Sequence, residues 1–327
     1  MKKISKILAS LVISGLALSM VPFNAFAIGI LPTRLAGTTA EQTAVQIADR
    51  TGWTGKAILA SSTSYGMIDA LTAGPLASYL EAPILLTGTE NSLNPATKEE
   101  LTKLSVKTVY VTSGTAVIKQ SVIDEIKGMG ITVVPLGGKD KYETSVNIAK
   151  QLTSVTKICI ANGLQDALSI ASIASARNQA ILLTDRDALP AVVSSYLAEN
   201  PNIISVDIIG GTGIISDAVG SVFSHYPDPA RHAGFTAYDT NKQVIQDFAR
   251  SISFDNVFIA NGETGIDALA GAPLAAQTSS PIVLTDGKRA PANDFVLSKS
   301  YAYTVRTALG GEAVVPEAIR SAVPAGN

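Results

Sequence analysis

Short apolar runs alternate with segments of helical periodicity along most of the chain. The first two runs are Ala57–Ala60 and Pro83–Leu86, and neither contains a charged residue. Runs of this length without polar alternation are typical of strands that are buried on both faces of a sheet. Segments such as Glu143–Gln151 carry apolar residues at helical spacing. Strands that alternate with helices predict an α/β fold with parallel strands and right-handed crossovers.

This pattern occurs three times. Each copy has a short apolar strand, a polar loop, an Asp-Ala-Leu triplet and a second apolar strand that ends on threonine. The triplets begin at Asp69, Asp166 and Asp267, so they are 97 and 101 residues apart. Two more landmarks recur in step: a glycine before a helical pattern, and a strand that closes on glycine. Their positions are Gly37, Gly138 and Gly234 for the first, and Gly114, Gly210-Gly211 and Gly310-Gly311 for the second.

We therefore expect three tandem modules of roughly 100 residues, each a small Rossmann-like or flavodoxin-like parallel sheet. The expected module boundaries are 28–134, 135–230 and 231–327. The copies should superpose with their Asp-Ala-Leu triplets at equivalent helix starts, and each should form its own sheet.

Residues 1–27 have the pattern of a secretory signal peptide. Three lysines precede the apolar run Ile7–Val21, and Ala25-Phe26-Ala27 matches an A-x-A cleavage site, so cleavage is expected before Ile28. A retained membrane anchor is the alternative, but the run is short for a helix that needs about 20 apolar residues. The C-terminal residues 321–327 contain no apolar anchor either. We expect an exported chain without a transmembrane anchor.

Charge and cysteine content narrow the possible partners. The full chain has 25 Lys and Arg against 27 Asp and Glu, and removal of the three lysines in 1–27 leaves a net charge of −5. A mildly acidic chain without a basic block is a poor nucleic-acid binder, so an anionic partner must contact local clusters. The single cysteine, Cys159, stands in an apolar run and is expected to be a buried core residue.

Few residues have the spacing of a catalytic or metal site. The recurring Asp69, Asp166 and Asp267 could be catalytic, but Asp is also a favoured helix cap, and we interpret all three as caps. The glycine pairs could cradle phosphate, but they lack phosphate-loop spacing, so tight turns are the preferred interpretation. His225 and His232 lie outside any metal-ligand spacing and are expected to be surface or boundary residues. We predict no metal, no cofactor and no catalytic residue.

Polar residues follow the second apolar strand of each copy. In parallel sheets, ligands bind beyond the carboxyl ends of the strands. Hydroxyls, carboxylates and bases side by side suit sugars or phosphates, although an ordinary polar loop explains them equally well. The candidate binding residues at these ends are Thr87, Thr184, Arg186, Thr285, Lys288 and Arg289, whereas the first copy has Glu90 in place of a base.

In combination, these landmarks resemble the clostridial type 2 cell-wall-binding repeat family, whose units usually occur in threes. The resemblance covers about residues 33–316. It implies three Rossmann-like units in a pseudo-threefold arrangement that attach noncovalently to anionic polymers of the Gram-positive wall. It also implies polymer contact near the P-I-L-L strands at 83–87, 180–184 and 281–285. The matching segments are Arg34–Gly37, Pro83–Thr87, Asp140–Thr144, Asp166–Leu168 and Gly210–Thr212.

The three copies depart from the family pattern in ways that leave open whether all of them bind. The basic residue of the family's D-R-Y-E-T segment is Lys141 in the second copy, whereas the other copies have Ala40 and Ala237. Pro135 stands in the second copy where the others have arginine. Those two arginines, Arg34 and Arg231, are further candidates for polymer contact in grooves between modules.

These observations predict a secreted cell-surface protein that is held noncovalently on an anionic wall polymer, teichoic-acid-like or phosphopolysaccharide. Three weak sites on one rigid frame would gain avidity over a single site. The three copies occupy the whole mature chain, so we expect no catalytic domain. Two alternatives remain: a wall-active hydrolase of the amidase type, and a secreted solute-binding protein.

Overall fold

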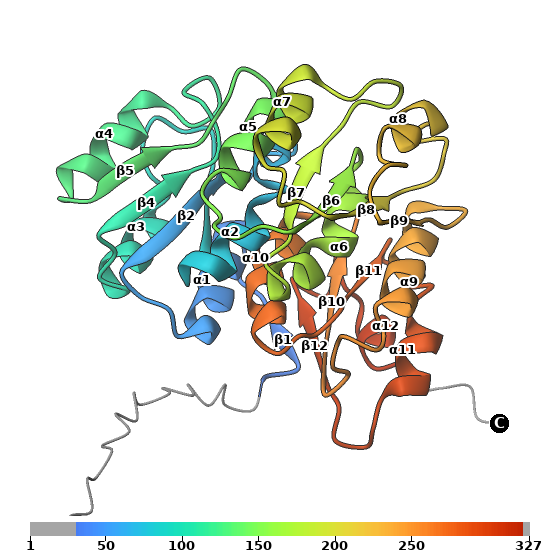
Figure 1. The fold of residues 1–327 in the computed structure, drawn as a ribbon. Helices are drawn as coiled ribbons and strands as arrows, with labels where there is room; N and C mark the ends of the chain where they lie inside the picture. The colour runs from blue at the N-terminus through green and yellow to red at the C-terminus, as the bar shows by residue number, and fades with distance from the viewer. Residues whose placement is uncertain (1–30, 323–327) are drawn as a thin grey trace, which may run out of the picture.

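The computed structural model describes residues 31–322, with the side chain of Asp228 excepted. It contains three separate four-stranded parallel sheets flanked by helices (Figure 1). The predicted α/β fold of three tandem modules is therefore confirmed. The expected signal peptide, residues 1–27, lies outside the described residues. Within 31–322, no helix has the length and apolar character that crossing a membrane requires.

Each sheet takes three strands from one repeat and its fourth from the segment that opens the next repeat. The strand orders are β3-β2-β4-β5, β7-β6-β8-β9 and β1-β12-β10-β11. The strand bounds are β1 Arg34–Leu35, β2 Lys56–Ser61, β3 Ile84–Thr87, β4 Thr108–Val111, β5 Thr132–Pro135, β6 Lys157–Ala161, β7 Ala180–Leu183, β8 Ser205–Ile209, β9 Asp228–His232, β10 Asn256–Asn261, β11 Ile282–Thr285 and β12 Val305–Leu309.

The fourth strand of each sheet comes from the next repeat and so links the modules into a closed ring. β5 and β9 join the first and second sheets and then lead directly into the second and third repeats. β1 does the same for the third sheet, where Arg34 pairs with Ala308 and Leu35 with Leu309. The start of the first repeat therefore completes the sheet of the last one, as Figure 1 shows where β1 lies beside β12.

Three helices, one from each repeat, pack against one another at the centre of the molecule and give it a pseudo-threefold arrangement. They are α2, α6 and α10, and Figure 1 shows the three sheets arranged around them. The helix bounds are α1 Ala40–Thr51, η1 Gly66–Ala70, α2 Ala73–Leu80, α3 Pro95–Lys103, α4 Gln120–Gly128, α5 Lys141–Ala149, α6 Leu164–Ala176, α7 Ala191–Glu199, α8 Asp217–Val222, α9 Ala237–Asp247, α10 Ile266–Gln277, α11 Asn293–Lys299 and α12 Glu317–Arg320.

Small residues allow these central helices to approach closely. A Cβ added to Gly74 of α2 would lie 2.8 Å from Ser175 Oγ of α6, so the Ser175 side chain would have to move to admit a larger residue. Buried apolar side chains from all three helices belong to one hydrophobic cluster that spans the three repeats. Burial of this kind is non-directional and scales with area, so the modules stabilise one another through their shared core.

The P-I-L-L strands β3, β7 and β11 are edge strands, yet they lie inside the molecule. Every residue of the three strands is buried, because helices from the same and the neighbouring repeat cover them. Side chains also occupy the free backbone edge. In β11, Asn241 donates to Ile282 O and accepts from Leu284 N–H, each at 3.0 Å. An edge that is satisfied in this way is closed to a further strand.

Candidate functional site

Two clefts open between modules at the carboxyl ends of the strands. Cleft 1 lies between the first and second repeats and has a volume of about 690 Å³. Cleft 2 lies between the second and third repeats and has a volume of about 450 Å³. Small-molecule sites typically measure ~300–1,000 Å³. Cleft 1 is lined by Thr63, Tyr65, Ile68, Asp69, Thr89, Gly114, Ala116, Val117, Lys119, Gly138, Lys139, Asp140, Lys141 and Tyr142.

The two clefts use equivalent positions of the repeat. One wall is the glycine turn that ends a sheet's third strand, and the other is the turn that opens the next repeat's first helix. The shared edge strand brings these two turns together. Cleft 2 is lined by Gly163, Gln165, Asp166, Gly211, Thr212, Gly213, Ile214, Gly234, Phe235, Thr236, Ala237 and Thr240.

The turn that opens the helix is held tightly in both clefts. In cleft 1, Asp140 caps α5 by accepting from Glu143 N–H at 2.8 Å, and Gly138 N–H donates to Thr144 Oγ1 at 2.9 Å. In cleft 2, Thr236 and Asp239 form a reciprocal capping box at the start of α9. The residue between glycine and cap is Lys139 in cleft 1 and Phe235 in cleft 2, so each projects from a fixed backbone.

None of the recurring aspartates caps a helix, and two of them line the clefts, Asp69 in cleft 1 and Asp166 in cleft 2. The N-cap residues of α6 and α10 are Gly163 and Gly265, and neither helix has a side-chain cap bond. The interpretation of the aspartates as caps is therefore wrong. Asp166 lies in the first turn of α6, where only 5 % of its surface is exposed, and burial raises its pKa to about 6.

A glycine in the left-handed region makes room for each of the two later aspartates. Gly210 has φ +120°, and a Cβ there would lie 2.5 Å from Asp166 Oδ2. Gly310 has φ +101° and stands against Asp267 in the same way, and burial raises the pKa of Asp267 to about 6. The first repeat differs, since its longer loop places Asp69 in the 3₁₀ helix η1. The predicted equivalence of helix starts thus holds for Asp166 and Asp267 only.

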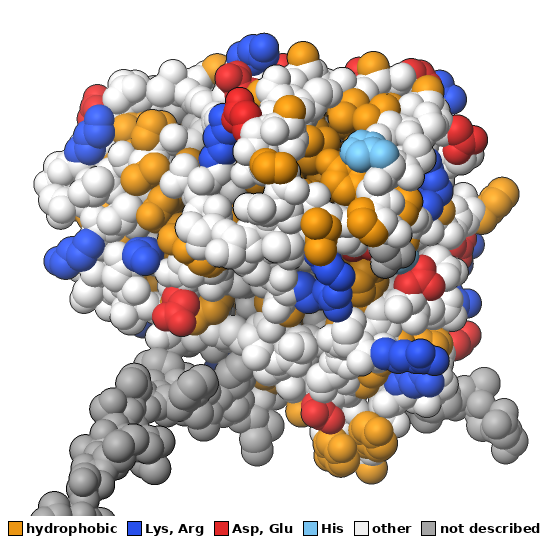
Figure 2. All heavy atoms as spheres, viewed as in Figure 1, with side chains coloured by type: hydrophobic (Ala, Val, Ile, Leu, Met, Phe, Trp, Pro, Cys, Tyr) orange, Lys and Arg blue, Asp and Glu red, His pale blue; other side chains and the backbone are white. Residues whose placement is uncertain are grey.

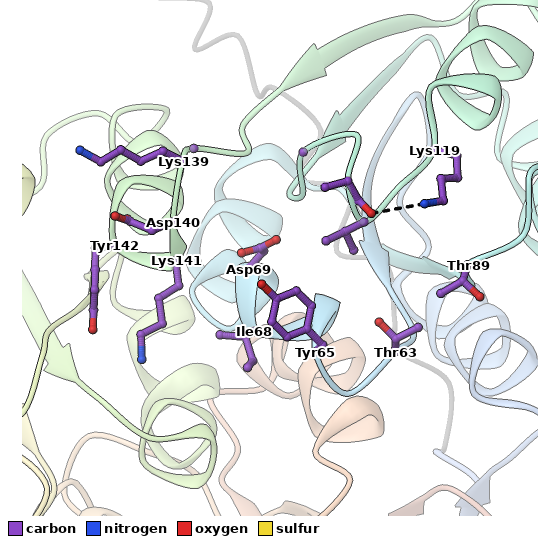
Figure 3. A pocket seen from close by; sticks show the side chains of 14 residues that line it. Thr63, Tyr65, Ile68, Asp69, Thr89, Lys119, Lys139, Asp140, Lys141 and Tyr142 are labelled. Carbon is purple, nitrogen blue, oxygen red and sulfur yellow. Dashed lines mark hydrogen bonds between the residues drawn. The ribbon is translucent and has the colours of Figure 1, made fainter.

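Three lysines distinguish cleft 1. Lys119 lies on one side of Asp69, and Lys139 and Lys141 lie on the other (Figure 3). Lys141 Nζ is 5.1 Å from the centre of the Tyr142 ring. None of the three ammonium groups lies within ion-pair distance of a carboxylate in the part of the chain that the structure describes. Their charge is available to an anion from outside.

Cleft 2 has no lysine at the equivalent positions. Ser216 takes the place of Lys119, Phe235 that of Lys139 and Ala237 that of Lys141. On the face seen in Figure 2, basic and acidic side chains are scattered among neutral ones. Of the two clefts, cleft 1 alone has lysines in its lining.

The basic loop residues named from the sequence lie at other junctions. Arg186 Nε donates to the carbonyl of Gly213, a residue of cleft 2, at 3.0 Å, and its guanidinium pairs with Asp187 at 3.1 Å. Lys288 and Arg289 are exposed on the equivalent loop of the third repeat. The structure does not bring these three side chains together into one site.

Arg34 and Arg231 occupy equivalent positions, and both bind backbone carbonyls. Arg34 Nη1 donates to Gly310 O at 2.8 Å, and Arg231 Nη1 donates to Gly210 O at the same distance. Each arginine thus holds the glycine turn that stands against a buried aspartate. In the second repeat, Pro135 takes this position.

The three threonines at the strand ends are buried, and their hydroxyls form hydrogen bonds with the backbone of the loops that follow the strands. Thr87 Oγ1 accepts from Asn94 N–H at 3.3 Å, and Thr184 Oγ1 donates to the carbonyl of Asp185 at 3.0 Å. Thr285 Oγ1 donates to Arg289 O at 2.7 Å. These hydroxyls shape the loops that border the clefts and do not line either cleft.

The chain matches a known family over most of its length. Three successive segments, residues 34–123, 136–220 and 231–320, match the model of cell wall binding domain 2. The chain belongs to the cell wall binding domain 2 (CWB2) family. The resemblance drawn from the repeat landmarks is thereby confirmed, and the family supports binding to a cell wall.

Two relatives from Bacillus subtilis (strain 168) carry amidase-related names. The chain is 30% identical over 258 residues to "N-acetylmuramoyl-L-alanine amidase LytC", covering 78% of this chain and 50% of the relative. It is 32% identical over 275 residues to "Amidase enhancer", covering 83% of this chain and 37% of the relative. The chain thus spans half or less of the length of these two relatives.

Two cell wall proteins of Clostridium difficile have similar structures. Cwp6 superposes with a TM-score of 0.82 at 29% identity, over 90% of this chain and 48% of Cwp6. Cwp8 superposes with a TM-score of 0.76 at 26% identity, over 88% of this chain and 50% of Cwp8. The three-module architecture is therefore shared with part of each of these two proteins.

His232 has a more elaborate environment than its sequence suggested. It is buried, its Nε2 lies 3.1 Å from Asp207 Oδ1, and its Nδ1 lies 2.7 Å from Asp247 Oδ2. Burial alone lowers the pKa of His232, but hydrogen bonds to the two carboxylates outweigh it and the net pKa is raised. No group of three His, Cys, Asp or Glu side chains in residues 31–322 is arranged to hold a metal ion. Cys159 is buried in the core.

Sequence reasoning missed Lys119, Lys139 and Phe235. Lys139 and Phe235 directly follow glycine landmarks that were recognised, and Lys119 comes five residues after Gly114, so their places near turns could be read from the repeat. What the repeat did not reveal is that the turns of successive modules face each other, because this depends on the pairing of β5 with β4 and of β9 with β8.

Proposed function

We propose that this chain binds an anionic polymer of the Gram-positive cell wall noncovalently, and that cleft 1 is the principal contact. The observation that carries the proposal is the set of three lysines, free of carboxylate partners, around one intermodular cleft. Phosphate groups at regular intervals along a polymer would place negative charge between Lys119 on one wall and Lys139 and Lys141 on the other. A location at the cell surface follows from this attachment and from the family.

The other junctions would add weaker contacts along the same polymer. Exposed charge pairs contribute only about 0.2–1 kcal/mol each, so a single cleft would hold a chain loosely. Arg186 at the second junction and Lys288 and Arg289 at the third are exposed bases on the same rigid ring. Simultaneous engagement of several sites converts weak contacts into stable retention.

We further propose that the described part of the chain binds without catalysis. Glycoside hydrolysis ordinarily needs two carboxyl groups on either side of the scissile bond. The lining of cleft 2 contains one, Asp166, although a pKa near 6 would suit a general acid. In cleft 1, the second carboxylate, Asp140, is engaged as the cap of α5. The amidase-related names of the Bacillus relatives make this a point to test directly.

A pulldown of residues 28–327 with purified Gram-positive walls tests both statements. We expect retention on intact walls, loss of retention after the anionic polymers are stripped from them, and no release of reducing sugar or free amine. Retention that survives stripping would show that the ligand is the peptidoglycan itself. Wall-degrading activity that disappears on replacement of Asp69, Asp166 or Asp267 would replace the binding proposal with a hydrolase.

A further inference from the structure

Resting on the proposed function, we propose that cleft 2 binds an uncharged sugar residue of the wall polymer, whereas cleft 1 binds its anionic group. The two clefts occupy equivalent places in the repeat but present different chemistry. This difference assigns a ligand class to each.

The first observation is a buried carboxylate that faces cleft 2 without a partner. Asp166 is 5 % exposed, and its carboxylate accepts no hydrogen bond from any residue that the structure describes. Its Oδ2 lies between two glycines, since Cβ atoms added to Gly163 and Gly210 would be 3.6 and 2.5 Å away. A buried carboxylate without hydrogen bonds is costly, and a ligand that donates to it would remove that cost.

Hydrogen-bond donors lie beside this acceptor. Gly163, the N-cap of the 13-residue helix α6, offers no side chain, so the first-turn N–H groups are uncapped. A sugar hydroxyl both donates and accepts, so neighbouring hydroxyls can donate to Asp166 and accept from these N–H groups. An ammonium group would also suit Asp166, but the positive end of the α6 dipole disfavours a cation there.

The second observation is Phe235, which is 100% exposed on the opposite wall. The turn that carries it is fixed by the capping box of α9 and by the bond from Gly234 N–H to Thr240 Oγ1 at 3.1 Å. A fully hydrated aromatic ring on a rigid turn is a platform for the apolar C–H face of a sugar ring. Ile214, which is also exposed, adds an apolar side chain on the facing wall of the cleft.

The third observation is the lack of a free cation in the lining of cleft 2. Lys119, Lys139 and Lys141 have no basic counterparts there. Arg186 stands at the rim, where its guanidinium is bound to Gly213 O and Asp187. A phosphate would meet Asp166 without a compensating base, which like-charge repulsion disfavours, whereas a neutral sugar meets no such penalty.

Two variants of the full mature chain test this assignment, Phe235→Ala and Asp166→Asn, with Tyr301→Ala as the matched control. Tyr301 is a 62% exposed aromatic on the turn before β12, at the other end of the strands. The probes are purified walls across a range of salt concentrations, and free monosaccharides, namely glucose, galactose, mannose and N-acetylglucosamine, followed by saturation-transfer NMR.

We expect Phe235→Ala to weaken wall retention roughly three- to tenfold, the scale of one aromatic contact, without changing its salt dependence. A neutral contact is not screened, whereas replacement of the cleft 1 lysines should flatten the salt dependence. At least one monosaccharide should show a saturation-transfer signal with the parent protein and no signal with either variant. Tyr301→Ala should behave as the parent. Asp166→Asn should remain folded.

The outcomes separate the two proposals. If Phe235→Ala and Asp166→Asn match the parent on walls and no monosaccharide shows transfer, the sugar site is refuted, and wall binding that depends on the lysines stands alone. If the parent fails to bind walls but a sugar signal depends on Phe235, cleft 2 is a sugar site and the wall proposal fails. If the cleft 2 variants flatten the salt dependence, cleft 2 binds charge and the assignment is wrong.

Discussion

Replacement of Asp166 by asparagine should make the folded protein more stable at neutral pH. Burial raises the pKa of this carboxyl from 3.8 to about 6. The folded state therefore holds its proton to a higher pH than the unfolded state, and stability falls as the pH rises from about 4 to about 6. This difference in pKa corresponds to about 3 kcal/mol in the free energy of unfolding, and that stabilisation is lost above pH 6. Asparagine has the same shape and does not ionise.

Urea denaturation at a series of pH values, followed by circular dichroism, gives the free energy of unfolding for parent and variant. We expect the two to be nearly equal near pH 4 and the variant to be more stable by about 2–3 kcal/mol at pH 7. Asp267→Asn should behave alike, since its pKa is also about 6. Asp124→Asn, at an exposed position, is the control and should show little change. A variant that is less stable than the parent at pH 7 would refute the picture of a costly, unpartnered carboxylate.

Three further predictions follow from single contacts. Arg231→Ala should lower the free energy of unfolding by about 1–3 kcal/mol, measured by thermal or urea denaturation, because the carbonyl oxygens of Gly210 and Ile215 lose a hydrogen-bond donor. An unchanged stability would show that the glycine turn does not depend on Arg231. His232→Gln should destabilise the fold more at pH 5.5 than at pH 8.5. The pKa of His232 is raised in the folded state, so the histidine stabilises the fold at pH values below its unfolded-state pKa, and this stabilisation is lost as the pH rises through its folded-state pKa. A loss of stability that is the same at both pH values would contradict this. The triple variant Arg186→Glu, Lys288→Glu and Arg289→Glu should weaken wall retention at low salt with the fold intact. Unchanged retention would show that these loops are not part of the polymer-binding surface.

The fold could be predicted because its signals are local. Apolar strands, Ala-rich helices and glycine turns recur at nearly constant spacing, and each depends on residues that are close in sequence. The closure of the ring was not predictable in this way. β1 is two residues long, and its partner strand lies more than 270 residues further along the chain, so neither periodicity nor propensity marks it.

The site was predictable only in outline. The polar loops beyond the strands lie at the same ends of the sheets as the two clefts, and Arg186 contacts Gly213 of cleft 2. The role of Asp166 was misread because a helix start favours Asp as a cap, whereas its environment is set by Gly210, 44 residues away and in the left-handed region. Burial against a distant glycine leaves no trace in the local sequence.

The most direct test of polymer binding through cleft 1 compares two triple variants on purified walls at low salt. The first replaces Lys119, Lys139 and Lys141 by glutamine. The second, the control, removes the same charge from the exposed lysines Lys56, Lys107 and Lys127, which lie near the opposite ends of strands β2, β4 and β5. We predict that the first variant loses most of its retention and its salt dependence, while the control binds as the parent does. Equal retention by both folded variants would contradict the assignment of cleft 1 as the polymer site.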